Sequence, residues 1–569
     1  MWASRRVELA VGASVIPLAI FHGGYAPAVW GWGAVACFWV AFLALVLQPT
    51  FALDRVLVAW GGALIALTAW TALSATWSQS VPRTMLEVER DLLYVAAILA
   101  LALVVRRGSA QQLVAGIAVG TAAVVIGALA YYLLAANEVD VTQGYLLFRP
   151  VGYANALGGL IAMGVPLLLG LSIADGPRGL QAVAAALAVI STVALYLTQN
   201  RSGWLALAAA LVIWLLTTFA VSEAAAAIVL AAIPSAAAIV VVSRLDLLAT
   251  SGAGGRAGRA HLAAAVVVLF AGLAAACALL RPRVRIGRRV AVRAAQGGAL
   301  SVSAALVAAG FHSGDRLHYW RAAVHGIEHH WLLGRGAGTF DEVWFRYRDV
   351  GRVVRDAHSL YLESLAELGL VGVLLIVIVL SIPLVAPRGS REPVLAAARG
   401  AYCAFLVHAA FEWDWEMPIV TLPALALGVA LLLSRSESRV IRVAAAARLG
   451  AATVVALLTL FAVDALAGNA YLVAAERRAL TGDNASAEAR ARHATRLLPW
   501  ASEPWLVIAD ARAGAGDAAG TRDALRKAAA RDPSDWLVWY RIAASSNGIE
   551  RTVAVRRISL LNPRLVRRR

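Results

Sequence analysis

Long apolar segments separated by short polar stretches fill most of residues 1–468. Each apolar segment approaches the roughly 20 residues that an α-helix needs to cross a bilayer. Membrane-spanning helices are predicted at residues 8–24, 28–48, 54–75, 91–105, 112–134, 154–173, 180–199, 204–221, 223–242, 261–280, 290–310, 360–384, 397–411, 417–434 and 447–468. The pattern therefore predicts an all-α fold, a polytopic transmembrane helical bundle over residues 1–468.

The composition supports a membrane protein. Hydrophobic residues make up 61% of the chain and charged residues only 15%, with a mean hydropathy of +0.73. Soluble domains carry about 25% charged residues, so a charged fraction of 15% excludes an ordinary soluble fold. The net charge of +17 comes almost wholly from arginine, because Lys527 is the only lysine. Arginine collects in the cytoplasmic loops of membrane proteins, so we expect a membrane partner and no nucleic acid.

The arginine distribution also predicts the orientation. With the N-terminus inside, the even-numbered spans return to loops that carry Arg106 and Arg107, Arg281–Arg289 and Arg435–Arg442. By the positive-inside rule these loops are cytoplasmic. We therefore expect a multi-pass protein of the cytoplasmic (inner) membrane, with residues 135–150, 199–203, 311–359 and the C-terminal region external.

The largest polar interruption of the apolar pattern is the external loop 311–359, which is rich in arginine and histidine. Within it, apolar residues recur at spacings of three and four, which predicts an amphipathic helix at the membrane interface or across the end of the bundle. These residues are Leu317, Trp320, Val324, Ile327 and Trp331. Gly334 and Gly336 should end that helix. The run Gly334–Gly338 is interpreted as a turn rather than a phosphate-binding loop, because no strand precedes it and no lysine follows.

Residues 469–569 change to a charged, alanine-rich, water-soluble composition. Pro499 and Pro533 lie 34 residues apart, and the tryptophans Trp505 and Trp536 recur at a similar spacing. A period near 34 with paired helices is typical of tetratricopeptide repeats. We predict an external tetratricopeptide-like helical domain over 469–569 that can bind a protein partner and performs no chemistry; a non-repetitive helical tail is the alternative.

Two polar motifs stand at the predicted external ends of helices. Arg201 is followed by Leu205 in an Arg-x-x-x-Leu pattern, and His358-Ser359 is followed after nine residues by Gly369-Leu370-Val371-Gly372. Arg316 with Tyr319-Trp320, and Arg149-Pro150 ahead of a helix, add to the pattern. Together with the large loop, these motifs resemble the O-antigen ligase family and the related lipid-linked polysaccharide polymerases, over roughly residues 20–435.

The resemblance implies a GT-C-like glycosyltransferase. Its expected reaction is a metal-independent, inverting transfer of a glycan from undecaprenyl pyrophosphate to a glycan or lipid acceptor on the external face of the membrane, without a cofactor. Guanidinium groups bind phosphate oxygens bidentately, so Arg201 and Arg316 are the first candidates to contact the pyrophosphate. Arg149 and Arg321 are the second. His358 is the candidate general base, since an imidazole pKa near 6.5 suits that role.

Several assignments stay open from the sequence alone. Glu363 and Glu367, four residues apart on one helix, either line the acceptor path or pair with nearby arginines. His358 can instead be an interfacial residue, and Arg201 a boundary anchor. The acidic residues between Phe411 and Pro418 can contact sugar or only stand at the interface. The motifs do not separate a ligase from a polymerase, and a transporter of lipid-linked sugar or anions is the alternative of a different class.

Overall fold

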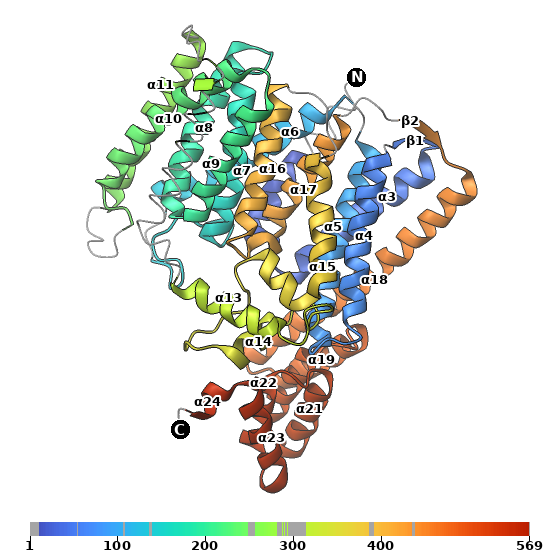
Figure 1. Ribbon diagram of the computed structural model, residues 1–569. Helices are drawn as coiled ribbons and strands as arrows, with labels where there is room; N and C mark the ends of the chain where they lie inside the picture. The colour runs from blue at the N-terminus through green and yellow to red at the C-terminus, as the bar shows by residue number, and fades with distance from the viewer. Residues whose placement is uncertain are drawn as a thin grey trace.

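The computed structural model describes residues 11–53, 55–105, 108–135, 139–248, 256–280, 314–385, 392–434 and 439–567, together with 287, 289, 290, 293 and 297. The predicted span over residues 290–310 lies largely outside the described residues. Within the described residues, the regular secondary structure is helical apart from two short strands (Figure 1). The first part of the bundle contains α2 (Val15–Ile20), η1 (His22–Gly24), α3 (Pro27–Leu47), α4 (Arg55–Ser74), α5 (Val81–Val104), α6 (Ala110–Leu134), α7 (Ala154–Ser172), α8 (Arg178–Thr198), α9 (Arg201–Thr217), α10 (Val221–Ser243) and α11 (Arg256–Leu280).

The second part begins with the loop region and ends in the tail. It contains α13 (Gly314–Ile327), α14 (Phe340–Tyr347), α15 (Leu360–Val385), α16 (Pro393–Ala409), η2 (Asp414–Glu416), α17 (Pro418–Leu433), α18 (Ala445–Leu480), α19 (Asn484–Leu497), α20 (Glu503–Gly514), α21 (Ala518–Arg531), α22 (Trp536–Ser545), α23 (Gly548–Leu561) and α24 (Pro563–Arg567). The strands β1 (Thr50–Leu53) and β2 (Arg439–Arg442) pair antiparallel, with Thr50 opposite Arg442.

Among the described residues, nine helices are long and apolar enough to cross a membrane: α3, α4, α6, α7, α8, α10, α11, α15 and α18. Shorter apolar helices cover Val11–Ile20, Arg201–Thr217, Pro393–Ala409 and Pro418–Leu433. The predicted all-α, polytopic bundle is therefore confirmed. The predicted span at 91–105 is the second half of α5, which begins ten residues earlier at Val81 because Pro82 occupies its first turn.

The centre of the bundle is built from small residues. Helix α7 is buried along most of its length and packs against α8, α9 and α16. A Cβ on Gly400 of α16 would lie 2.4 Å from the Ala210 carbonyl oxygen of α9. Glycine therefore permits the backbones of α9 and α16 to approach, as small residues do in membrane helix packing.

The loop region differs in detail from the sequence expectation. The predicted helix is confirmed as α13, but it ends at Ile327 rather than at Gly334. Leu317 and Val324 of the predicted apolar stripe are 45% and 53% exposed. The side that packs on the protein carries Tyr319, Ala322 and Ala323 instead, because α13 rests on α14 and α15 and the close approach favours small residues. The run Gly334–Gly338 is a turn between α13 and α14, as predicted.

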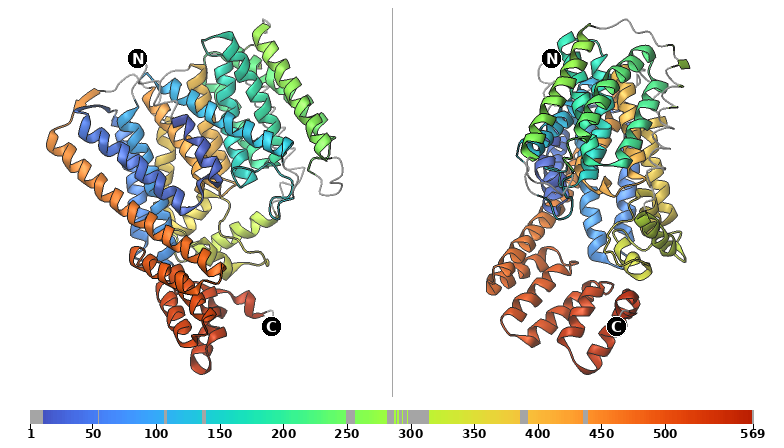
Figure 2. Two further views of the ribbon diagram at one scale, coloured as in Figure 1. Left: turned by 180° about the vertical axis from the view of Figure 1, so that it is seen from behind. Right: turned by 90° about the vertical axis from the view of Figure 1, so that its left-hand side faces the viewer.

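The tail is joined to the bundle by one continuous helix. Helix α18 runs through residue 468, the predicted end of the last span, without a break to Leu480 (Figure 2). Successive helices from α18 to α23 then pack on one another. Asp483 and Asp517, 34 residues apart, cap α19 and α21, and each follows a glycine with positive φ. The repeat of 34 residues is thus present in the helical structure, and its assignment as tetratricopeptide-like stays an interpretation.

Candidate active site

Polar side chains from four separate segments meet at one end of the bundle, around the carboxylate of Glu412. Its Oε1 accepts a hydrogen bond from Ser202 Oγ at 2.7 Å and pairs with Arg316 Nη2 at 2.5 Å. Its Oε2 accepts a hydrogen bond from Asn155 Nδ2 at 2.9 Å. Glu412 is 1% exposed. The carboxylate therefore joins α7, α9 and α13 through the segment that follows α16.

The start of α9 directs Ser202 toward this centre. Asn200 is the N-cap of α9; its Oδ1 accepts a hydrogen bond from the Gly203 N–H at 2.9 Å and lies 2.6 Å from Ser202 Oγ. Its Nδ2 donates to the Asn155 carbonyl oxygen at 2.8 Å, which fixes α9 to the start of α7. Side chains of neighbouring helical residues point in different directions. Ser202 is therefore buried, whereas Arg201 is exposed.

A second buried pair holds the segment that carries Glu412. His408 Nε2 lies 2.9 Å from Asp414 Oδ2, and both side chains are at most 1% exposed. A Cβ on Gly159 of α7 would lie 2.6 Å from the His408 ring, so the glycine makes room for the imidazole. This pair ties the end of α16 to η2 and so limits the movement of the residues between them.

The electrostatic setting keeps Glu412 ionised. Burial by itself would raise the pKa of Glu412, but Arg316, nearby histidines and the Ser202 hydroxyl lower it below its ordinary value. An ionised buried carboxylate is costly unless it is paired and hydrogen-bonded, and both conditions are met here. Arg316 uses one nitrogen for this pair. A guanidinium has five N–H donors, so others can bind a ligand.

His358 stands beside this group in an unusual backbone conformation. Its φ of 54° is in the left-handed region, which a non-glycine residue seldom occupies. Its ring lies 5.2 Å from the ring of Tyr319, between centroids. Nδ1 lies 3.1 Å from the carbonyl oxygen of Asp356. Because a carbonyl only accepts, Nδ1 carries the proton and Nε2 keeps a lone pair.

The pKa of His358 favours this neutral form. Burial lowers the pKa, and the charge of Arg316 lowers it further, while Glu412 and Asp414 oppose the shift. The net direction is below the ordinary value, so the imidazole is unprotonated at neutral pH. A neutral imidazole with a defined tautomer can accept a proton at Nε2.

Two buried glutamates of α15 organise the loop around His358. Glu363 Oε2 accepts the Ala357 N–H at 2.7 Å. Glu367 accepts the N–H groups of Gly338 at 2.9 Å and Phe340 at 2.8 Å, at the start of α14. Both glutamates therefore position backbone. Their predicted contact with the acceptor stays a prediction.

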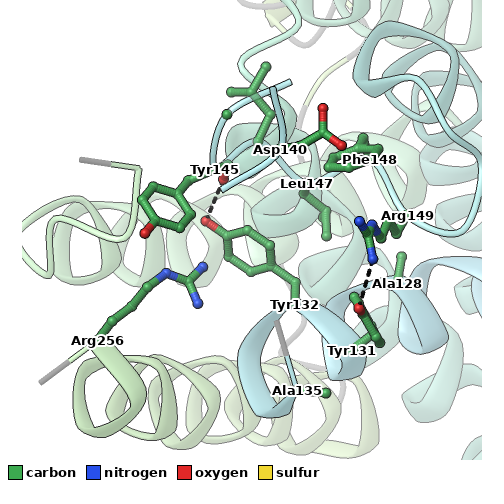
Figure 3. Close-up of a pocket in the computed structure, with 12 residues that line it drawn as sticks. Ala128, Tyr131, Tyr132, Ala135, Asp140, Tyr145, Leu147, Phe148, Arg149 and Arg256 are labelled. Carbon is green, nitrogen blue, oxygen red and sulfur yellow. Dashed lines mark hydrogen bonds between the residues drawn. The ribbon is translucent and has the colours of Figure 1, made fainter. Parts of the chain in front are cut away.

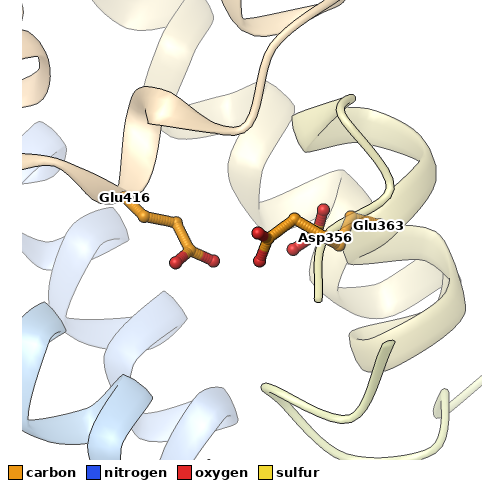
Figure 4. A group of neighbouring side chains, drawn as sticks. All are labelled: Asp356, Glu363 and Glu416. Carbon is orange, nitrogen blue, oxygen red and sulfur yellow. The ribbon is translucent and has the colours of Figure 1, made fainter. Parts of the chain in front are cut away.

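Three carboxylates gather behind the His358 turn. Asp356, Glu363 and Glu416 point toward one another from three segments, with oxygens within 4.8 Å (Figure 4). Glu416 also pairs with the buried Arg90 at 2.8 Å. The Arg90 guanidinium offsets part of the negative charge of the three carboxylates and already occupies Glu416. The expectation of a metal-independent reaction stays a prediction that a chelator can test.

The comparison with known families gives the region its identity. Residues 186–377 match the model of the O-antigen ligase family. The chain contains an O-antigen ligase domain. The match runs from α8 into α15 and includes Arg201, Arg316 and His358. No curated protein and no solved structure matched the chain.

The residues predicted from sequence divide into two groups within and beside this O-antigen ligase domain. Arg316 and His358 come together, since both charges of the Arg316–Glu412 pair act on the pKa of His358. Arg201 and Arg321 lie exposed. Arg149 lines a separate pocket, where it donates a hydrogen bond to the Tyr131 hydroxyl at 3.0 Å.

Sequence reasoning did not include Glu412, Ser202 or Asn155 among the site residues. Each had a weak signal. Ser202 lies inside the Arg201–Leu205 motif, Asn155 opens α7, and Glu412 begins an acidic segment between two apolar helices. Their convergence depends on the packing of α7, α9 and α16, which no local pattern specifies.

Proposed function

We propose that this protein is a membrane glycosyltransferase that transfers a glycan from undecaprenyl pyrophosphate to an acceptor hydroxyl on the external face of the cytoplasmic membrane. The observation that carries the proposal is the neutral imidazole of His358 beside the ion pair of Arg316 with the buried Glu412. A sugar hydroxyl is a weak nucleophile and needs a base, and a departing pyrophosphate needs positive charge. The O-antigen ligase domain supports a role in joining glycans.

The proposed chemistry is a single displacement. The acceptor oxygen forms a bond to the anomeric carbon of the donor sugar, and its proton moves to His358 Nε2. The bond from the anomeric carbon to the pyrophosphate oxygen breaks, and the electron pair leaves with the pyrophosphate. One displacement on one carbon inverts its configuration. Arg316 stabilises the negative charge that develops on the leaving group.

The exposed arginines complete the proposed donor site. The charge of Arg316 is balanced by Glu412, so a pyrophosphate requires further cations. Arg201 at the start of α9 and Arg321 in the middle of α13 are exposed and are proposed to contact the outer phosphate oxygens. The arginine-rich loops expected on the opposite side support an external location.

Reconstitution tests the proposal. Purified protein in nanodiscs is supplied with an undecaprenyl-pyrophosphate glycan and either a lipid acceptor or a second copy of the donor glycan. Transfer to the lipid acceptor identifies a ligase, and glycan lengthening identifies a polymerase. Activity should persist with a chelator, and Arg316→Lys should restore only part of what Arg316→Ala loses, because lysine lacks the planar fork. Donor movement across a bilayer without formation of a glycosidic bond would instead support a transporter.

A further inference from the structure

A second polar pocket lies beside the ligase domain and shares none of the residues around Glu412. It has a volume of about 300 Å³ and is formed by α6, the α6–α7 segment and the start of α11. This volume is at the lower end of small-ligand pockets. Its lining combines two arginines with four aromatic rings: Arg149, Arg256, Tyr131, Tyr132, Tyr145 and Phe148.

The arginines are held by the aromatic rings. The guanidinium of Arg256, a 5% exposed residue, lies 5.0 Å from the Tyr132 ring centroid and 4.9 Å from that of Tyr145. Arg149 lies 5.5 Å from the Phe148 ring. In Figure 3 the two guanidinium groups stand on opposite sides of the Tyr132 ring. A guanidinium stacked on a ring face carries its N–H donors along its edge, in the plane of the group.

The tyrosines and the loop carboxylate are fixed by their own contacts. The Tyr132 hydroxyl donates to the Tyr145 carbonyl oxygen at 2.9 Å. Asp140, at the edge of the pocket, accepts hydrogen bonds at Oδ1 from Thr142 N at 2.8 Å and Gln143 N at 2.9 Å. The Asp140 carboxylate thus stabilises the turn of the loop between α6 and α7. The pocket therefore presents preorganised cationic and aromatic groups.

We infer that this pocket binds an anionic sugar residue of a glycan, one that carries a carboxylate or a phosphate. Guanidinium N–H groups match the two oxygens of such an anion, and aromatic side chains supply flat apolar faces for a sugar ring. The binding itself is independent of transfer. The use of the pocket to hold donor or acceptor glycan during transfer rests on the proposed function.

Equilibrium binding to the full-length protein in nanodiscs of zwitterionic lipid tests the inference. The probe is a labelled uronic acid disaccharide, compared with its methyl ester, which lacks the charge. We expect saturable binding of the acid alone. Arg256→Gln should weaken that binding roughly 10- to 100-fold, as expected for a lost charge-assisted hydrogen bond. Arg244→Gln, an exposed arginine at the end of α10, is the matched control and should leave binding unchanged.

A second variant keeps the inference testable if the first variant misfolds. If Arg256→Gln does not fold, Arg149→Gln, which alters an exposed arginine of the same pocket, should show the same loss. Equal binding of acid and ester, or equal binding by the arginine variants, would overturn the inference. So would binding of an anionic phospholipid, added to the nanodisc, at this pocket without any binding of the disaccharide, since that result identifies a lipid-headgroup site.

The His358→Ala protein separates this inference from the proposed function. It should bind the uronic acid probe as the unchanged protein does. If the protein binds the probe but never transfers glycan, the inferred sugar-binding pocket is supported and the proposed function is refuted. Transfer that depends on His358, without probe binding, would do the reverse.

Discussion

At the scale of single residues, the site depends on two groups held in costly states. His358 occupies a left-handed backbone conformation, and Glu412 is an ionised carboxylate with 1% exposure. Both states persist because neighbours fix them: Ala357 is held by Glu363, and Glu412 has three polar partners. Strained and buried charged residues of this kind concentrate at functional sites.

Replacement of His358 should separate catalysis from donor binding. His358→Ala should reduce the transfer rate by roughly 10²–10⁴, the usual effect of losing a positioned general base. Donor binding should persist, because the pyrophosphate contacts are assigned to arginine. Initial rates and donor affinity, measured with the same nanodisc preparation, decide this. Near-normal turnover in the variant would contradict the assignment of the base.

The pKa of His358 predicts the pH profile. Burial and Arg316 lower that pKa, so the neutral base is lost only below the ordinary value near 6.5. The transfer rate should therefore be flat at neutral pH and fall on the acid side, with a midpoint below 6.5. His358→Ala should lack that limb in its residual rate. A profile that falls between pH 7 and 8 would contradict a lowered pKa.

Glu412 should act by positioning. Glu412→Gln keeps the size of the side chain but removes the charge that pairs with the partly buried Arg316, and losing one partner of a buried ion pair is destabilising by at most about 3–5 kcal/mol. We expect weaker donor binding or lower kcat, and a lower Tm. Glu328→Gln is a matched control, because Glu328 is exposed and its carboxylate lies 3.1 Å from the equally exposed His325. Equal behaviour of both variants would remove Glu412 from the site.

At the scale of elements, the loop between α13 and α15 is held in place through backbone contacts. The Leu370 N–H donates to the Trp331 carbonyl oxygen at 2.8 Å, and the Gly336 N–H donates to the Glu367 carbonyl oxygen at 2.8 Å. Gly369 has a φ of 66° and a ψ of −167°, a combination that only glycine adopts readily. A Cβ there would lie 2.3 Å from the Leu332 carbonyl oxygen. The glycine of the sequence motif therefore serves the loop rather than the ligand.

Gly369→Ala should detach this loop from α15. We expect a stability loss of at least about 1–3 kcal/mol from backbone strain and lower transfer activity. Thermal unfolding and limited proteolysis of the loop measure both effects. Gly127→Ala is the control, since a Cβ at that position of α6 has nothing within 4 Å. It should stabilise by about 0.5–1 kcal/mol.

At the scale of the whole molecule, the tail rests on the loop that forms the site. Ser534 Oγ lies 2.6 Å from Glu342 Oε1 of α14, and Ser80 Oγ lies 2.6 Å from Asp532 Oδ2. The rings of Phe345 and Trp536 lie 5.4 Å apart. Glu367 of α15 accepts the Phe340 N–H at the start of α14. The tail therefore contacts the same short helix that α15 positions.

The carboxylates at this interface predict a pH-dependent docking of the tail. Burial, and then the charge of Asp532, raise the pKa of Glu342 from 4.5 to about 8, with Asp341 acting in the same direction and Arg83 opposing it. A group with a raised pKa binds more protons in the docked state. Docking should therefore be strongest below pH 4.5 and weaken as pH rises toward 8, by up to about 1.4 kcal/mol per pH unit.

Fluorescence energy transfer between labels on the tail and on α14 measures this docking across pH. Glu342→Gln should reduce the dependence, because glutamine does not titrate, while burial also raises the pKa of Asp341 and of Asp535 and keeps a remainder. Glu550→Gln, far along the tail and paired with Arg526, is a control that should keep it. Docking that strengthens between pH 5 and 8 in the unchanged protein would have the wrong sign and would refute the assignment.

The resemblance of the motifs to the O-antigen ligase family indicated His358 and Arg316 as residues of one site. The sequence by itself determined the all-α membrane bundle, the end of the bundle where polar groups gather, and the repeat of 34 residues in the tail. These follow from local patterns, because apolar length, arginine placement and helix periodicity act along the chain. Only the tertiary structure decided that Ser202 rather than Arg201 faces Glu412, that Glu367 caps the start of α14, and that Arg149 belongs to a separate pocket. Those contacts join residues from helices far apart in sequence, and the rotation of each helix is set by how it packs against its neighbours.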